Sequence, residues 1–203
     1  MNARIEQLFG MVLQITPTGE KHSRVTLFTE HFGMQSVLFR KTAKLGLSSQ
    51  PDLFDDLECT LSYGSISSDM PFIREWKAVG KRTFLARDHK IFFAASDIAR
   101  FFLLNGSHIL ETKSLYDLLI KSINGLKNDQ PLAVRIKTLF RFAQSEGLPA
   151  KQAWLPQLSQ SRQKNAKLIL NTPLADLSNL PADAEKILKS LIDWLNAETE
   201  LKY

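Results

Sequence analysis

The chain has 203 residues, 44% of them hydrophobic and 23% charged, which is enough for one large domain or two small ones with a buried core. Its net charge of +5 permits a polyanionic partner without requiring one. The lone Cys59 excludes a disulfide framework and a cysteine-based zinc site within the chain. No apolar run has the length of a membrane span and no signal peptide is recognisable, so we expect a cytoplasmic protein.

Three consecutive strands are expected between Gly10 and Lys44, because apolar, β-branched and aromatic residues alternate there. They are predicted at residues 11–16, 24–29 and 34–39. Turn-forming residues separate them, including Gly19 and Gly33. The third strand leads directly into the cations Arg40, Lys41 and Lys44.

Two more strands are expected at residues 57–63 and 72–79. The first of these alternates cleanly between apolar and polar residues, and the second carries Arg74, Trp76 and Lys77. Five strands within about eighty residues, with no helical crossover, predict an antiparallel sheet or a small barrel.

Helical periodicity replaces this pattern after a boundary at residues 81–87. Helices are predicted from Ile91 to a stop at Gly106, from Thr112 to Leu126, from Pro131 to Gly147, and from Pro181 through Leu195. Between them, residues 148–175 contain no acid, and the polar segment QLSQSRQKN predicts a loop or a poorly ordered stretch. The fold class is therefore α+β.

No residue set indicates catalysis or metal binding. The histidines His22, His31, His89 and His108 lack metal-ligand spacing, and a phosphate loop, a nucleophile elbow and a kinase signature are all missing. The adjacent Asp55 and Asp56 would point to opposite faces of a strand. We expect neither an enzyme nor a cofactor, and no requirement for zinc.

Basic residues around the predicted sheet carry the functional signal. They are Lys21, Arg24, Arg40, Lys41, Lys44, Arg74, Lys77, Lys81 and Arg82. A phosphate backbone is held by several separated cations, and single-stranded bases stack on exposed aromatics, here Phe39, Phe72 or Trp76. The alternative is that these cations decorate a solvated surface and that the aromatics fill the core. Phe92, Phe93, Phe101 and Phe102 in the helical region are expected in the core, although a groove between helices could instead seat an apolar peptide end.

The order of several short segments resembles the RecO family of bacterial recombination mediators, over roughly residues 5–150. The segments are Gly10-Met11-Val12-Leu13, Gly19-Glu20-Lys21, Thr26-Leu27-Phe28-Thr29 with Gly33, Phe39-Arg40-Lys41-Thr42-Ala43-Lys44, Gln50-Pro51 with Leu53-Phe54, the strand at 57–63, Ser114-Leu115-Tyr116-Asp117-Leu118-Leu119 and Phe142-Ala143-Gln144-Ser145-Glu146-Gly147-Leu148-Pro149. Thr42 departs from the family's usual glycine, and the four-cysteine zinc module of many members is missing.

This resemblance implies an N-terminal OB-fold, residues 1–82, that binds DNA, and a helical domain, residues 83–203. It implies a non-catalytic mediator of recombinational DNA repair that binds single- and double-stranded DNA and helps load recombinase or anneal strands. The implied partners are RecR and the acidic tail of the single-stranded DNA-binding protein, for which Arg100, Lys121, Arg135 and Arg141 are candidate contacts. Because residues 1–82 hold ten basic and nine acidic residues, a protein-interaction adaptor with weak nucleic-acid binding is the alternative. RNA binding by the same barrel is a further alternative.

Overall fold

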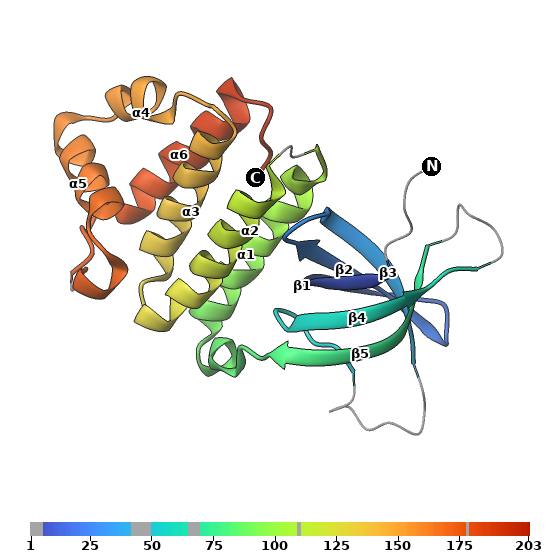
Figure 1. Ribbon diagram of the computed structural model, residues 1–203. Coiled ribbons are helices and arrows are strands. Elements are labelled where there is room, and N and C mark those ends of the chain that lie inside the picture. Colours follow the sequence, from blue (N-terminus) through green and yellow to red (C-terminus); the bar gives the residue numbers. More distant parts are fainter. Residues whose placement is uncertain (1–5, 42–49, 65–69, 109–110, 178) are drawn as a thin grey trace. The chain divides into compact units, whose positions relative to one another are not determined.

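The computed structural model describes residues 6–41, 50–64, 70–108, 111–177 and 179–203. The chain divides into two compact units, Met1–Arg82 and Thr83–Tyr203, coloured blue to green and green to red in Figure 1. Within the described residues, no helix combines the length and apolar character needed to cross a membrane.

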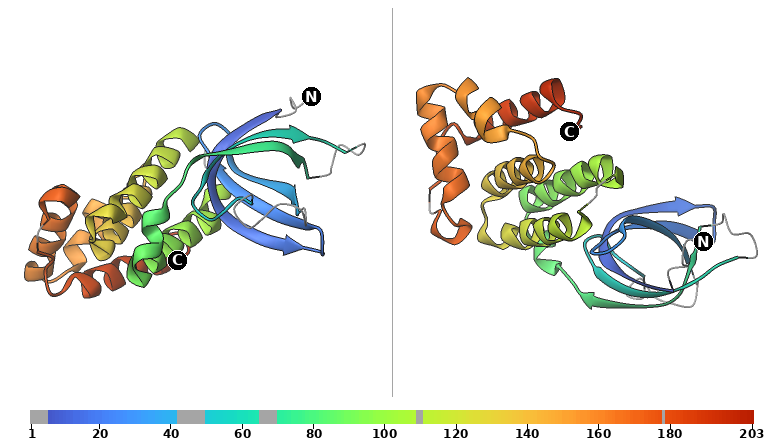
Figure 2. Two further views of the ribbon diagram at one scale, coloured as in Figure 1. Left: turned by 90° about the horizontal axis from the view of Figure 1, so that it is seen from below. Right: turned by 45° about the horizontal axis from the view of Figure 1, so that its top comes forward.

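The first unit is a closed barrel of five strands in the order β1-β2-β3-β5-β4, seen end-on in the right panel of Figure 2. The strands are β1 (Gln7–Thr18), β2 (His22–Thr29), β3 (Gly33–Arg40), β4 (Asp56–Ser62) and β5 (Phe72–Gly80). Strand β1 pairs antiparallel with both β2 and β4. A parallel contact between Leu38 and Phe72 joins β3 to β5, and the Leu38 N–H donates to the Pro71 carbonyl at 2.8 Å. The predicted barrel is confirmed.

The barrel interior is filled by alternate residues of each strand, as the period of two requires. Its buried cluster is Leu8, Val12, Val25, Leu27, Val37, Phe39, Leu57, Cys59, Leu61 and Ile73. Trp76 packs against this cluster and meets Phe39 edge-to-face, with ring centroids 6.0 Å apart. On β2 and β3 the side chains between these positions therefore point out of the barrel, whereas the register of β1 shifts between Val12 and Gln14.

Gly10 shows why a glycine stands near the start of the first strand. A Cβ atom on Gly10 would lie 2.6 Å from the Phe28 carbonyl oxygen of β2 and 2.9 Å from Thr29 Cγ2. Because the closest obstacle is backbone, it cannot rotate away as a side chain could. The close approach of β1 and β2 at this point thus requires glycine.

The second unit is built of helices, and the order of the predicted helices is confirmed. The longer ones are α1 (His89–Asn105), α2 (Thr112–Gly125), α3 (Pro131–Ser145), α5 (Gln160–Asn171) and α6 (Ala184–Glu198). Short helical segments connect them: η2 (Thr83–Arg87), η3 (Gly106–His108), η4 (Leu126–Asn128), α4 (Ala150–Ala153), η5 (Leu155–Gln157) and η6 (Leu174–Asp176). The Asp88 carboxylate caps α1 by accepting from the Lys90 N–H at 2.6 Å.

An aromatic cluster lies between α1 and α3. The ring of Phe142 lies 4.8 Å from that of Phe101 and 5.1 Å from that of Phe102, both edge-to-face. All three side chains are buried, which confirms the core prediction for Phe101 and Phe102. The same prediction is wrong for Phe92 and Phe93, which are 40% and 63% exposed. Phe93 stands on the face of α1 opposite its buried stripe and Phe92 at the edge of that stripe, so their positions on the helix leave both partly exposed.

The segment QLSQSRQKN, residues 157–165, corrects the prediction of a loop, since most of it lies in α5. Helix α5 is polar and buries only Ala166 and Ile169, so its own sequence carries a weak helical signal. Its C-terminal end is held from outside, because Lys137 Nζ of α3 donates to the carbonyls of Leu170 at 3.1 Å and Thr172 at 2.7 Å. Tertiary contacts of this kind supply most of a short helix's stability.

Candidate functional site

The outer face of β2 and β3 presents cations. Ser23, Val25 and Leu27 of β2 are buried, so the alternate residues Arg24 and His22 point outward. The register pairs Arg24 with Leu38 and His22 with Arg40, which places both arginines on one face as diagonal neighbours. Such neighbours are about 7 Å apart. Both arginines are exposed.

Lys21 and Lys41 extend this surface at the end of the barrel where β1 turns into β2. The Lys41 N–H donates to the Lys21 carbonyl at 2.8 Å, so their side chains start from adjacent chain segments. We call Lys21, Arg24, Arg40 and Lys41 the β2–β3 cation face. Within the described residues, none of the four forms an ion pair, and β1, β2 and β3 contain no aspartate or glutamate. Lys44, predicted to belong to this cluster, and Thr42 before it lie outside the described residues.

One aromatic pair accompanies these cations. Phe72, at the start of β5, and His22 meet edge-to-face with ring centroids 5.7 Å apart, and both are half-buried. The other two aromatics proposed for base stacking, Phe39 and Trp76, face the barrel core. For them the core interpretation is therefore correct.

The cations of β5 differ from those of β2 and β3 in having acidic neighbours. Lys77 stands opposite Glu58 of β4 in the register, and Glu75 lies two residues before it on the same strand. Arg74 is exposed at an irregularity of the β4–β5 pairing, and Lys81 is exposed beyond the strand end. The structure thus separates the predicted site into a group on strands that contain no acid, with Glu20 beside Lys21 in the turn, and a group interleaved with carboxylates on β4 and β5.

Arg82, predicted with the other cations to bind phosphate, is engaged in contacts within the barrel. Its side chain is only 6% exposed, and Nη1 donates to Asp56 Oδ1 at 2.9 Å and to the Phe54 carbonyl at 2.7 Å. Phe54 has a φ of +66°, which is uncommon for a bulky residue. Arg82 thus ties the segment before β4 to the end of β5.

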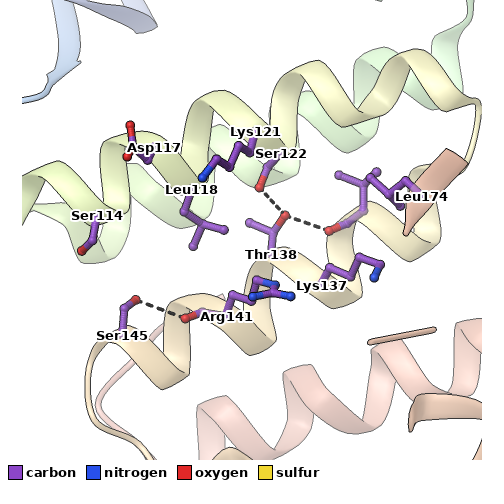
Figure 3. Close-up of a pocket in the computed structure, with 11 residues that line it drawn as sticks. Ser114, Asp117, Leu118, Lys121, Ser122, Lys137, Thr138, Arg141, Ser145 and Leu174 are labelled. Carbon is purple, nitrogen blue, oxygen red and sulfur yellow. Dashed lines mark hydrogen bonds between the residues drawn. The ribbon is translucent and has the colours of Figure 1, made fainter. Parts of the chain in front are cut away.

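A pocket of about 520 Å3 lies along α2 and α3 of the helical unit, shown in Figure 3. Its cations are Lys121, Lys137 and Arg141, and its apolar wall is Leu118, Val134 and Leu174. Asp117 is its acidic residue. Beneath them, the buried Thr138 hydroxyl lies 2.7 Å from both the Ser122 hydroxyl and the Val134 carbonyl, which joins the two helices.

Two of the pocket's cations repel each other. Burial, and then the charge of Arg141, lowers the pKa of Lys137. Within the described residues, neither side chain forms an ion pair with a carboxylate. An anion in the pocket would relieve this repulsion.

The four candidate cations of the helical unit therefore separate into two groups. Lys121 and Arg141 line the pocket. Arg135 is engaged elsewhere, since Nη2 lies 2.8 Å from Asp97 Oδ2 and 2.5 Å from the Tyr203 hydroxyl. Arg100 lies over the Tyr203 ring at 5.4 Å. The pocket was not visible in the sequence, because it forms only where the spacing of α2 and α3 brings Lys121 and Arg141 together.

Within the described residues, no group of three His, Cys, Asp or Glu side chains is placed to hold a metal ion. Burial raises the pKa of the Cys59 thiol to about 12, so it stays protonated at neutral pH. Burial likewise raises the pKa of Asp55, against the opposing hydrogen bond from Asp52 and the charge of Lys81.

Comparison with known proteins gives no assignment: no protein-family model matches the chain, and no curated protein matches it. The functional argument therefore depends on the β2–β3 cation face and on the pocket of the helical unit.

Proposed function

We propose that the barrel is an OB-fold that binds single-stranded DNA along the β2–β3 cation face. The strand order β1-β2-β3-β5-β4, with β1 pairing on both sides, is the arrangement expected of a five-stranded Greek-key barrel. OB-folds bind oligonucleotides on the face of strands 2 and 3 and on the loop between strands 1 and 2. Arg24 and Arg40 stand on that face, and Lys21 is in that loop.

The observation that carries the proposal is the gathering of four cations on the β2–β3 cation face, none of which forms an ion pair within the described residues. Four cations gather beside three strands that contain no acid. A phosphate backbone would be attracted by all four, with a log–log salt slope of about −0.7 for each contact on a single strand. The half-buried His22–Phe72 pair offers a ring edge for a base beside Arg40.

With the resemblance to the RecO family, this binding mode supports a role in recombinational DNA repair in the cytoplasm. The protein would hold single-stranded DNA and help load recombinase or anneal strands, without catalysis of its own. Double-stranded DNA and RecR are proposed as further partners on the resemblance alone.

The pocket of the helical unit supports the proposed contact with the tail of the single-stranded DNA-binding protein. An acidic, apolar-ended peptide would place its carboxylate between Lys121 and Arg141 and its apolar side chains against Leu118 and Leu174. This pocket is also the observation that favours the adaptor alternative, since a protein could keep the peptide site and bind DNA weakly.

The test compares two triple variants that remove equal charge from the barrel. Arg24→Ala/Arg40→Ala/Lys41→Ala removes three members of the β2–β3 cation face, and Arg74→Ala/Lys77→Ala/Lys81→Ala is the matched control. Single-strand binding is measured by fluorescence anisotropy over a range of salt. We expect the first variant to flatten the log–log slope by about 2, at about 0.7 per lost contact, and the control to change it less.

An unchanged affinity and an unchanged salt slope in the first variant would contradict the DNA proposal and favour the adaptor alternative. A second titration uses an acidic tail peptide with Lys121→Ala/Arg141→Ala and, as its control, Arg100→Ala. Loss of peptide binding only in the pocket variant is the expected result. Retained binding would refute the peptide site.

A further inference from the structure

A second hollow of the helical unit collects cations from three helices. Its volume is about 390 Å3, and it receives Arg141 from α3, Lys151 from α4 and Lys167 from α5. The apolar part of its wall comes from Phe140, Leu155 and Leu170. Gln144 and Asn171 add two amide groups, and no carboxylate lines it. Three cations around one hollow repel one another unless an anion lies between them.

The basic surface continues along α5. Lys164 and Lys167 border an adjoining hollow of about 540 Å3, again without a carboxylate in its lining. The two lysines are three residues apart, so they lie on the same face of the helix. We call Arg141, Lys151, Lys164 and Lys167 the α5 cation track.

No carboxylate of the described residues is paired with a member of the α5 cation track. The hydrogen bond that Lys167 Nζ donates goes to the neutral Gln163 Oε1, at 3.3 Å. The 28-residue segment 148–175, which supplies α4 and α5, contains no aspartate or glutamate. The Asp183 carboxylate, which approaches α5 from the start of α6, accepts from Asn165 Nδ2 at 2.8 Å.

We propose that the α5 cation track is a second contact for a single-stranded nucleic acid, which lays successive phosphates from Arg141 and Lys151 to Lys164. Repeated cations suit the repeated phosphates of a nucleic acid, and the hollow beside Lys164 is lined by no apolar residue of the described chain that could seat the apolar end of a peptide. Phe140 is buried, so no ring in either hollow is free to stack on a base. The site therefore binds the phosphate groups and discriminates little between base sequences. The inference rests on the proposed function in one respect: both take a single-stranded nucleic acid as the ligand.

The test uses the full-length chain and labelled oligo-dT, with a mixed-sequence oligonucleotide of equal length beside it. The variant Lys151→Ala/Lys164→Ala/Lys167→Ala keeps Arg141, which also lines the peptide pocket. Its control, Lys90→Ala/Lys186→Ala/Lys202→Ala, removes equal charge from exposed lysines that border neither hollow. We expect the track variant to flatten the salt slope by up to about 2 for both oligonucleotides, and the control to leave the slope unchanged.

A photo-crosslinker in place of Leu168, which is 50% exposed between the track's lysines and the end of α5, gives a second readout. We expect it to crosslink to the oligonucleotide. An unchanged slope without a crosslink overturns the inference, and so does a track variant that loses an acidic peptide instead of DNA. The Arg24→Ala/Arg40→Ala/Lys41→Ala variant separates the two proposals. If it changes DNA binding and the track variant does not, the α5 cation track is refuted and the barrel site stands. If the track variant changes DNA binding and the β2–β3 variant does not, the barrel site is refuted and the track stands.

Discussion

Replacing Arg82 tests whether this cation stabilises the barrel or binds nucleic acid. Arg82→Ala removes the bonds to Asp56 and to the Phe54 carbonyl and leaves a carboxylate that is only 18% exposed. Breaking a buried pair from one side costs about 3–5 kcal/mol. The residual exposure of Asp56 lets water solvate part of the orphaned charge, so we expect about 3 kcal/mol, the lower end of that range.

This loss corresponds to a fall in Tm of about 6–12 °C for a chain of this size. Urea and thermal unfolding of Arg82→Ala measure it, with Lys81→Ala as the exposed neighbouring control. Arg82→Lys keeps the charge without the planar fork and should fall between the two. A double-mutant cycle with Asp56→Ala isolates the coupling between the side chains. At a temperature well below Tm, the salt slope of DNA binding should be that of the unmodified protein.

The reasoning would be refuted by an Arg82→Ala variant that unfolds within about 0.5 kcal/mol of the unmodified protein, the usual range for a surface substitution. A flattened salt slope in the same variant would restore Arg82 to the DNA-binding residues.

Three further predictions concern single residues. Gly10→Ala should lower the free energy of unfolding by about 1–3 kcal/mol, because its Cβ would overlap the Phe28 carbonyl; an unchanged Tm would show that β1 and β2 can separate there. Cys59 is 1% exposed with a pKa of about 12, so a thiol reagent should modify it only at the rate of unfolding, and fast labelling of the native protein would contradict its burial. Burial raises the pKa of Tyr203 despite the hydrogen bond from Arg135, so the phenol's contribution to stability is complete below its ordinary value of 10 and is lost as pH rises through the higher folded value. Tyr203→Phe should therefore remove part of the alkaline loss of stability in unfolding curves, and identical pH profiles would rule out this linkage.

Local pattern was enough to predict the barrel strands and the main helices. Alternation with a period of two marks the strands, and it is set by the pleat itself, so Leu57 and Leu61 had to share the buried face. The stripe of Ile187, Leu191 and Trp194 follows in the same way from the period of 3.6 and predicts α6. The cations around the third strand were also visible, because Arg40 and Lys41 follow it directly.

Only the tertiary structure shows which of those cations are paired with carboxylates. Nothing in the local sequence distinguishes Arg82 from Arg24. Strand closure brings Asp56 to Arg82, while the register pairs Arg24 with Leu38, and Arg24 forms no ion pair within the described residues. Helix α5 and both hollows of the helical unit depend on contacts between segments far apart in the chain, such as Lys137 with Thr172. A short-range sequence pattern cannot predict such contacts, because they form, and stabilise the helix, only when folding brings the distant segment into place.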